Sequence, residues 1–210
     1  MFEVQGSGFS AAILIGGRAT RFEGRDKSAL VVDGQTILSR QLTAIAGVAP
    51  GADVDLMLAG SRPAGGVPPS ARTVPDIVPG CGPLSGLHAA LSSARFEHTL
   101  MLACDMPFVT APLLRHLLAL GRAADAPDIV VPRTDRGYHP LCAVYSRACL
   151  EPAARRLARG DFKLMSMFGE MRVRVVTADA LEAFGDADRL LANVNTSIEY
   201  RAIEANGMQS

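Results

Sequence analysis

Short apolar runs alternate with longer amphipathic stretches over the first 130 residues of the chain. Four runs have the length of buried strands: Ala11–Ile15, Val54–Ala59, Thr99–Ala103 and Ile129–Val131. Apolar residues at helical spacing predict three helices between and after these runs, over residues 36–48, 83–91 and 111–124. Strands that alternate with helices predict a mostly parallel sheet with helices on both faces.

Turn and cap signals set the limits of several elements. Asp33-Gly34 is a turn signal, and Thr36 is a suitable N-cap for the first helix. Gly82-Pro83 opens the second helix with proline at its first position. The remaining predicted elements are an edge strand over 72–75, strands over 139–145 and 173–176, and helical segments over 149–157, 161–170 and 196–206.

The first strand ends in Gly16-Gly17 and continues into a basic loop that contains Arg18, Arg21, Arg25 and Lys27. Glycine lets a main chain approach a ligand closely, and N–H groups and cationic side chains can bind phosphates. The spacing matches neither a Walker A loop nor the GxGxxG fingerprint. The loop is therefore a candidate anion site, although a surface turn with scattered charge has the same composition.

Two further segments can bind a phosphorylated ligand. Asp105 comes two residues after the third strand, where carboxylates of open α/β sheets often bind ligands. Mg²⁺ favours one or two carboxylates together with substrate phosphates. The helix start at Gly82 presents free N–H groups that favour anions. Taken singly, a turn aspartate and an ordinary capped helix remain alternatives.

Composition limits the classes of function. The 210 residues are 49% hydrophobic, with 21 basic and 21 acidic residues, which argues against nucleic acid as the main partner. Its four cysteines include no CxxC pair, and we expect them to be reduced and mostly buried. We find neither an export signal nor a run of about 18 apolar residues. We therefore expect a cytoplasmic protein without membrane partners.

Five motifs are spread in sequence over residues 11–200, in the order in which one known family has them. They are ILIGG-RATRF with the following Asp-Lys pair, Asp76 ahead of GPLSG, ACDMP, HPLCAVY and NVNT. Together they resemble the molybdenum cofactor guanylyltransferases of the MobA type. The resemblance implies a Rossmann-like, three-layer α/β/α nucleotidyltransferase fold in one domain. It also implies a nucleotide-binding half over about residues 9–110 and an acceptor-binding half over about 111–210.

The resemblance implies transfer of GMP from Mg²⁺-bound GTP to the phosphate of molybdopterin, with release of pyrophosphate. Cofactor-insertion chaperones or molybdoenzymes are possible further partners. Asp105 would hold the magnesium ion, and Arg21 and Lys27 would offset the charge of the phosphates. The implied nucleotide-binding residues are Leu14, Ile15, Gly16, Gly17, Lys27, Asp76, Gly82 and Asp105. The implied acceptor-binding residues are His139, Asn193 and Asn195.

Three positions depart from the family pattern. Glu23 stands in the basic loop, and we expect its carboxylate to point away from a triphosphate or to pair with Arg18 or Arg25. Ile15 and Ala59 occupy positions at which the family tends to have alanine and asparagine. Two alternatives stay open. One is a cytidylyltransferase or another nucleotidyltransferase acting on a sugar or alcohol phosphate, and the other is a non-catalytic nucleotide- or cofactor-binding protein.

Overall fold

The apolar runs of the sequence form one mixed sheet in a computed structural model of the protein. The structure describes residues 8–15, 27–60, 66–76, 81–194 and 200. The strands of the sheet are β1 (Phe9–Ile15), β4 (Val54–Gly60), β5 (Ala71–Val74), β6 (His98–Ala103), β7 (Ile129–Thr134), β8 (Gly137–Tyr138), β9 (Cys142–Ser146) and β10 (Val173–Val176). A separate hairpin joins β2 (Val31–Val32) to β3 (Gln35–Thr36).

The strand order is β10-β7-β9-β6-β1-β4-β5, and β8 pairs with β7. Strand β1 lies between β4 and β6 and is parallel to both. The pairs β4–β5 and β7–β10 are also parallel, whereas β9 is antiparallel to β6 and β7. The predicted mostly parallel sheet is confirmed, and β5 lies at an edge as expected.

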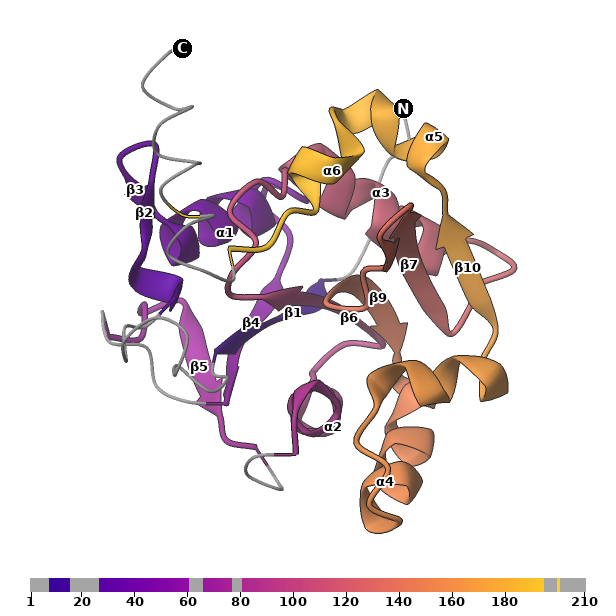
Figure 1. The fold of residues 1–210 in the computed structure, drawn as a ribbon. Helices are drawn as coiled ribbons and strands as arrows, with labels where there is room; N and C mark the ends of the chain where they lie inside the picture. The colour runs from indigo at the N-terminus through magenta and orange to yellow at the C-terminus, as the bar shows by residue number, and fades with distance from the viewer. Residues whose placement is uncertain (1–7, 16–26, 61–65, 77–80, 195–199, 201–210) are drawn as a thin grey trace.

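Helices cover both faces of the sheet. The longer ones are α1 (Ile37–Ala46), α2 (Pro83–Ser93), α3 (Ala111–Gly121) and α4 (Leu150–Ala158). Figure 1 shows α1 and α3 above the sheet together with the short helices α5 (Ala178–Leu181) and α6 (Ala187–Leu190), and α2 and α4 below it. The remaining elements are the 3₁₀ helices η2 (Lys27–Ala29), η3 (Arg147–Cys149), η4 (Leu164–Glu170) and η5 (Glu182–Phe184).

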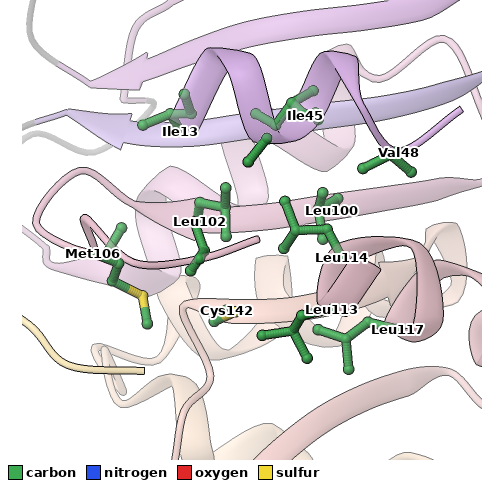
Figure 2. Close-up of a cluster of buried hydrophobic side chains, with 14 of the residues drawn as sticks. Ile13, Ile45, Val48, Leu100, Leu102, Met106, Leu113, Leu114, Leu117 and Cys142 are labelled. Carbon is green, nitrogen blue, oxygen red and sulfur yellow. The ribbon is translucent and has the colours of Figure 1, made fainter. Parts of the chain in front are cut away.

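Alternating residues of the strands supply two hydrophobic cores. In β1, Ala11 and Ile13 face α1 and α3, while Ala12 faces α2, as the two-residue period of a strand requires. Figure 2 shows Ile13, Leu100 and Leu102 packed with side chains of α1 and α3 in the first core. Helices cover both faces of the sheet. A polar ligand therefore has to bind at the carboxyl ends of the strands.

The turn and cap signals have the predicted local effects. Asp33 and Gly34 have φ values of 48° and 76° and turn the β2–β3 hairpin, as expected for a type I′ Asp-Gly turn. The Thr36 hydroxyl accepts a hydrogen bond from Ser39 N–H at 3.1 Å and caps α1. Pro83 begins α2 after Gly82, whose φ is 72°.

The structure corrects several predicted limits. The predicted strand over 139–145 begins only at Cys142, because Gly137 and Tyr138 first pair back onto β7. The predicted helix over 161–170 is a 3₁₀ segment that starts at Leu164. Helices α5 and α6 were not predicted, since four residues are too short to show a helical period. The predicted helix over 196–206 lies outside the described residues except for Tyr200.

Candidate functional site

The candidate site lies at the carboxyl ends of β1 and β6, where the chain changes direction across the sheet. From β1 the chain adds β4 and β5 on one side and then returns to add β6 on the other. Ligands of open α/β sheets bind in the crevice at such a switch point. Leu14 O accepts a hydrogen bond from Cys104 N–H at 3.2 Å, so the two strand ends are joined there.

Lys27 and Asp105 meet at this switch point. Lys27 Nζ lies 3.1 Å from Asp105 Oδ2, and the two side chains are 24% and 15% exposed. Asp105 Oδ1 is buried and has no hydrogen-bond partner among the described residues. A buried carboxylate oxygen has to be satisfied by a donor or a cation. Lys27 and Asp105, both predicted site residues, are thus brought together, and one oxygen of the carboxylate is left for a ligand.

The donor set at this switch point suits a hard divalent cation that shares its coordination with substrate. Carboxylate oxygens are the ligands that Mg²⁺ prefers, and Mg²⁺ usually takes only one or two of them. Within the described ranges, no three His, Cys, Asp or Glu side chains cluster closely enough to form a complete metal cage. Asp105 thus fits a metal whose other ligands come from a bound phosphate and water.

The main chain around Asp105 is held from two other parts of the fold. Gln41 on α1 is fully buried, and its amide donates to Ala103 O at 2.6 Å and to Met106 O at 3.1 Å. Val194 N–H donates to Asp105 O at 2.8 Å. These bonds position the loop that carries the carboxylate.

Sequence reasoning missed Gln41. The residue occupies the buried stripe of α1 with Ile37, Leu38, Ala44 and Ile45. A polar residue on an apolar stripe has to find hydrogen-bond partners inside the protein, and this was the signal that could have identified it.

Asp76 lies two residues beyond β5 and supplies a second carboxylate to this edge. Its Oδ1 is buried without a hydrogen-bond partner in the described part of the chain, and burial raises the pKa of the carboxyl above its usual value. A Cβ at Gly86, in the first turns of α2, would lie 3.5 Å from this oxygen. Asp76 therefore sits beside the start of α2.

Leu14 and Ile15 differ in what they offer a ligand. Leu14 is partly exposed and packs over α2, where a Cβ at Gly86 would come within 2.2 Å of its Cδ2. Ile15 is 3% exposed and belongs to the first core, so a ligand contact there would use the main chain. Ala59 is 1% exposed and pairs with Leu14 inside the sheet, and thus the departure at this position lies within β4.

His139 lies at the same edge of the sheet as Asp105. Its Nε2 is 3.0 Å from Thr134 Oγ1, and burial lowers the pKa of the imidazole despite the nearby Asp188 carboxylate. Two residues later, Leu141 O accepts a hydrogen bond from Ala103 N–H at 2.8 Å. The loop that carries His139 is therefore joined to the end of β6.

Asn193 lies on the other predicted acceptor segment. Its side chain is exposed, and the following residue, Val194, is bonded to Asp105 as described above. Both predicted acceptor motifs thus reach the Asp105 loop. Gly16, Gly17, Arg21, Glu23 and Asn195 lie outside the described residues.

Two hollows of the described surface border helix α1. One of about 500 Å³ is bordered by α1, by Phe108 and by Arg189 of α6, and both Arg40 and Arg189 place a guanidinium over the Phe108 ring. A second, of about 390 Å³, lies between α1 and residues 66–69. Pro107 of the ACDMP motif borders the first hollow, but neither hollow is lined by any of the predicted site residues that the structure describes.

Two expectations from composition can be compared with the described residues. Cys104, Cys142 and Cys149 are buried and Cys81 is partly exposed, and all four are free thiols. Among the helices of the described ranges, none combines the length and the apolar character that a membrane crossing needs.

Comparisons of the sequence identify close relatives. A profile of the family described as "MobA-like NTP transferase domain" matches residues 11–175. The chain is 34% identical over 187 residues to the probable molybdenum cofactor guanylyltransferase of Pelotomaculum thermopropionicum, covering 89% of this chain and 87% of that protein. It is 33% identical over 193 residues to the molybdenum cofactor guanylyltransferase of Desulfosudis oleivorans, covering 92% and 93%.

Solved structures share the fold. Molybdopterin-guanine dinucleotide biosynthesis protein A from Archaeoglobus fulgidus superposes with a TM-score of 0.76 at 22% identity, covering 96% of this chain and 100% of that one. The 2-C-methyl-D-erythritol 4-phosphate cytidylyltransferase of Thermus thermophilus gives 0.63 at 19% identity, covering 96% and 99%. Rv0371c of Mycobacterium tuberculosis, in complex with manganese, gives 0.59 at 19% identity, covering 95% and 99%. The predicted Rossmann-like nucleotidyltransferase fold is confirmed.

Proposed function

Because this chain belongs to the MobA-like NTP transferase family, and is thus a nucleotidyltransferase, we propose that it transfers GMP from GTP to the phosphate of molybdopterin and releases pyrophosphate. The names of the two relatives, molybdenum cofactor guanylyltransferases that span most of the chain, support this choice of substrates. The fold alone does not separate GTP from CTP, since a cytidylyltransferase shares it.

The observation that carries the proposal is the Lys27–Asp105 pair at the switch point, with Asp105 Oδ1 buried and without a partner among the described residues. Transfer of a nucleotidyl group needs positioning and charge neutralisation more than covalent chemistry. A cation and a carboxylate with an available oxygen supply both in one place. The manganese complex of the structural relative Rv0371c is consistent with divalent metal use in proteins of this fold.

Each site residue has a distinct proposed role. Asp105 would hold Mg²⁺, which when bound neutralises phosphate charge and orients the α-phosphate. Lys27 stabilises the negative charge that develops toward the leaving pyrophosphate, and Arg21 is proposed to help it. Asp76 and Gly82, with the main chain at Leu14–Gly17, contact the nucleotide. The attacking phosphate is already an oxyanion, so the reaction needs no strong general base.

The acceptor is assigned to the other side of the Asp105 loop. We place the nucleotide on about residues 9–110 and molybdopterin on about residues 111–210, with His139, Asn193 and Asn195 as contacts. The hydrogen bonds of Leu141 O and Val194 N–H to the β6 end support this arrangement, because they bring both acceptor motifs to the metal-binding loop. The two substrates would then meet over Asp105.

Pyrophosphate release tests the proposal. Purified protein is supplied with molybdopterin, Mg²⁺ and either GTP or CTP. We expect release with GTP and the formation of a guanine dinucleotide. Release with CTP alone would identify a cytidylyltransferase, and release with neither would favour a binding protein or another acceptor phosphate.

The variant Asp105→Asn separates metal-dependent transfer from folding. Because a neutral amide oxygen binds Mg²⁺ more weakly than a carboxylate, we expect at least about a hundredfold loss of kcat with a retained fold. The exposed Asp125→Asn is the matched control and should leave kcat unchanged. Full magnesium-dependent activity of Asp105→Asn would remove the metal assignment.

A further inference from the structure

Arg133 and Tyr138 form a stacked pair on the β7–β8 hairpin. They are directly opposite each other in the antiparallel register, so their side chains share one face of the hairpin. The Arg133 guanidinium lies 5.2 Å from the centroid of the Tyr138 ring. The Phe168 ring of η4 meets the Tyr138 ring edge-on, with centroids 5.6 Å apart at 78°.

This pair is exposed to solvent and is not explained by core packing. Tyr138 is 37% exposed and Arg133 is also exposed. Arg133 forms no ion pair within the described ranges. A guanidinium on an aromatic ring, which is itself held by Phe168, presents a positively charged layer on which a planar ring can stack.

The hairpin brings this layer to the edge of the sheet that carries Asp105. Strands β6 and β7 are both antiparallel to β9 and thus run in the same direction, so their carboxyl ends share one edge. Tyr138 immediately precedes His139, and Leu141 of the same loop is bonded to the end of β6. The stacked pair therefore stands beside the loop to which we assign the acceptor.

We propose that Arg133 and Tyr138 form the stacking surface for the flat pterin ring of the acceptor. The inference rests on the proposed function and names the contact that selects a planar heteroaromatic acceptor over a sugar phosphate. Stacking binds the ring through its π-face, and the guanidinium adds attraction to a ligand that also carries a negatively charged phosphate.

Substitution of Tyr138 tests the stacking surface. For Tyr138→Ala we expect the KM for molybdopterin to rise about tenfold, which corresponds to about 1.4 kcal/mol and lies within the range for a base stacked on an aromatic side chain. The KM for GTP should stay unchanged. Tyr138→Phe keeps the ring and should restore the wild-type KM for molybdopterin within about twofold. Phe162→Ala removes an equally exposed aromatic ring (42% exposed) and should change neither KM.

A second measurement separates the stacking surface from the overall reaction. Binding of molybdopterin is measured by ultrafiltration without nucleotide, for wild type, Tyr138→Ala and Tyr138→Phe. About tenfold weaker binding by Tyr138→Ala alone supports the surface even if GTP gives no transfer, in which case only the proposed reaction fails. An unchanged affinity, or a parallel rise of the KM for GTP in the kinetic assay, overturns the inference.

Discussion

Replacing Gln41 with methionine removes the side chain that ties α1 to the loop carrying Asp105. Methionine has a similar unbranched shape and no amide, so α1 keeps its buried stripe while Ala103 O and Met106 O lose their donor. We expect two consequences, a lower free energy of unfolding and a weaker hold on the Asp105 main chain.

The size of the first effect follows from the contacts. A buried carbonyl that loses its donor costs about 1–3 kcal/mol, and Gln41 serves two carbonyls. Gln41 Oε1 is itself buried without a partner in the described residues, so its removal returns about 1–3 kcal/mol. The net loss is therefore about 1–3 kcal/mol, or roughly 2–12 °C in Tm at this chain length.

Urea unfolding measures the first effect and the magnesium dependence of transfer measures the second. If Gln41 positions Asp105, the magnesium concentration for half-maximal activity should rise in Gln41→Met while the KM for GTP at saturating magnesium stays unchanged. Gln35→Met is the matched control, because Gln35 is exposed on β3. Equal stability of the two variants, or an unchanged magnesium requirement in Gln41→Met, would refute the reasoning.

Two further predictions concern two carboxylates at opposite ends of the parallel strands, Asp55 near the start of β4 and Asp76 after the end of β5. Asp55 is 4% exposed and accepts hydrogen bonds from Ser10, Arg72 and the Arg95 N–H. Asp55→Ala should lower the free energy of unfolding in urea by about 3 kcal/mol. The KM for GTP and the KM for molybdopterin should both stay unchanged. Burial alone would raise the pKa of Asp55, but these bonds outweigh it and lower the pKa below 3.8. Its stabilising effect should be complete above that pH and be lost as the pH falls through the lowered pKa. Asp76 has the opposite sign, because its raised pKa means that the folded state holds the proton more tightly. Wild type should therefore lose stability relative to Asp76→Asn as the pH rises from 3.8 through the raised pKa, and parallel pH profiles would contradict this.

The sheet was predictable because its central strands are short apolar runs with helices between them. The Asp-Gly turn and the Thr36 cap were predictable because each acts through its own side chain or backbone conformation. The direction of β9 was not predictable, because side chains alternate with the same two-residue period in a parallel and in an antiparallel strand. Its direction follows from the β7–β8 hairpin, in which Tyr138 pairs back onto Arg133.

The Lys27–Asp105 pair was predictable for a geometric reason. Both residues follow strands whose carboxyl ends share an edge, and that edge contains the switch point. The supporting contacts were not predictable, because Gln41 and Val194 reach the loop from elements far away in sequence. Helical periodicity places Gln41 on the buried side of α1, but it does not indicate which carbonyl groups accept hydrogen bonds from its amide.

Under the proposed assignment of the acceptor, the antiparallel insertion of β9 makes the acceptor-binding side modular. The segment between β7 and β9 leaves and re-enters the sheet through neighbouring strands, so both of its ends are anchored in the framework. Turns of this kind tolerate changes in length and sequence with little effect on the strands that hold them. If this segment binds the acceptor as proposed, residues 135–141 can diverge to fit new acceptors while β1, β6 and the Asp105 loop stay unchanged. A grafted β7–β9 connection from a relative with a different acceptor is the natural route to a transferase of altered specificity.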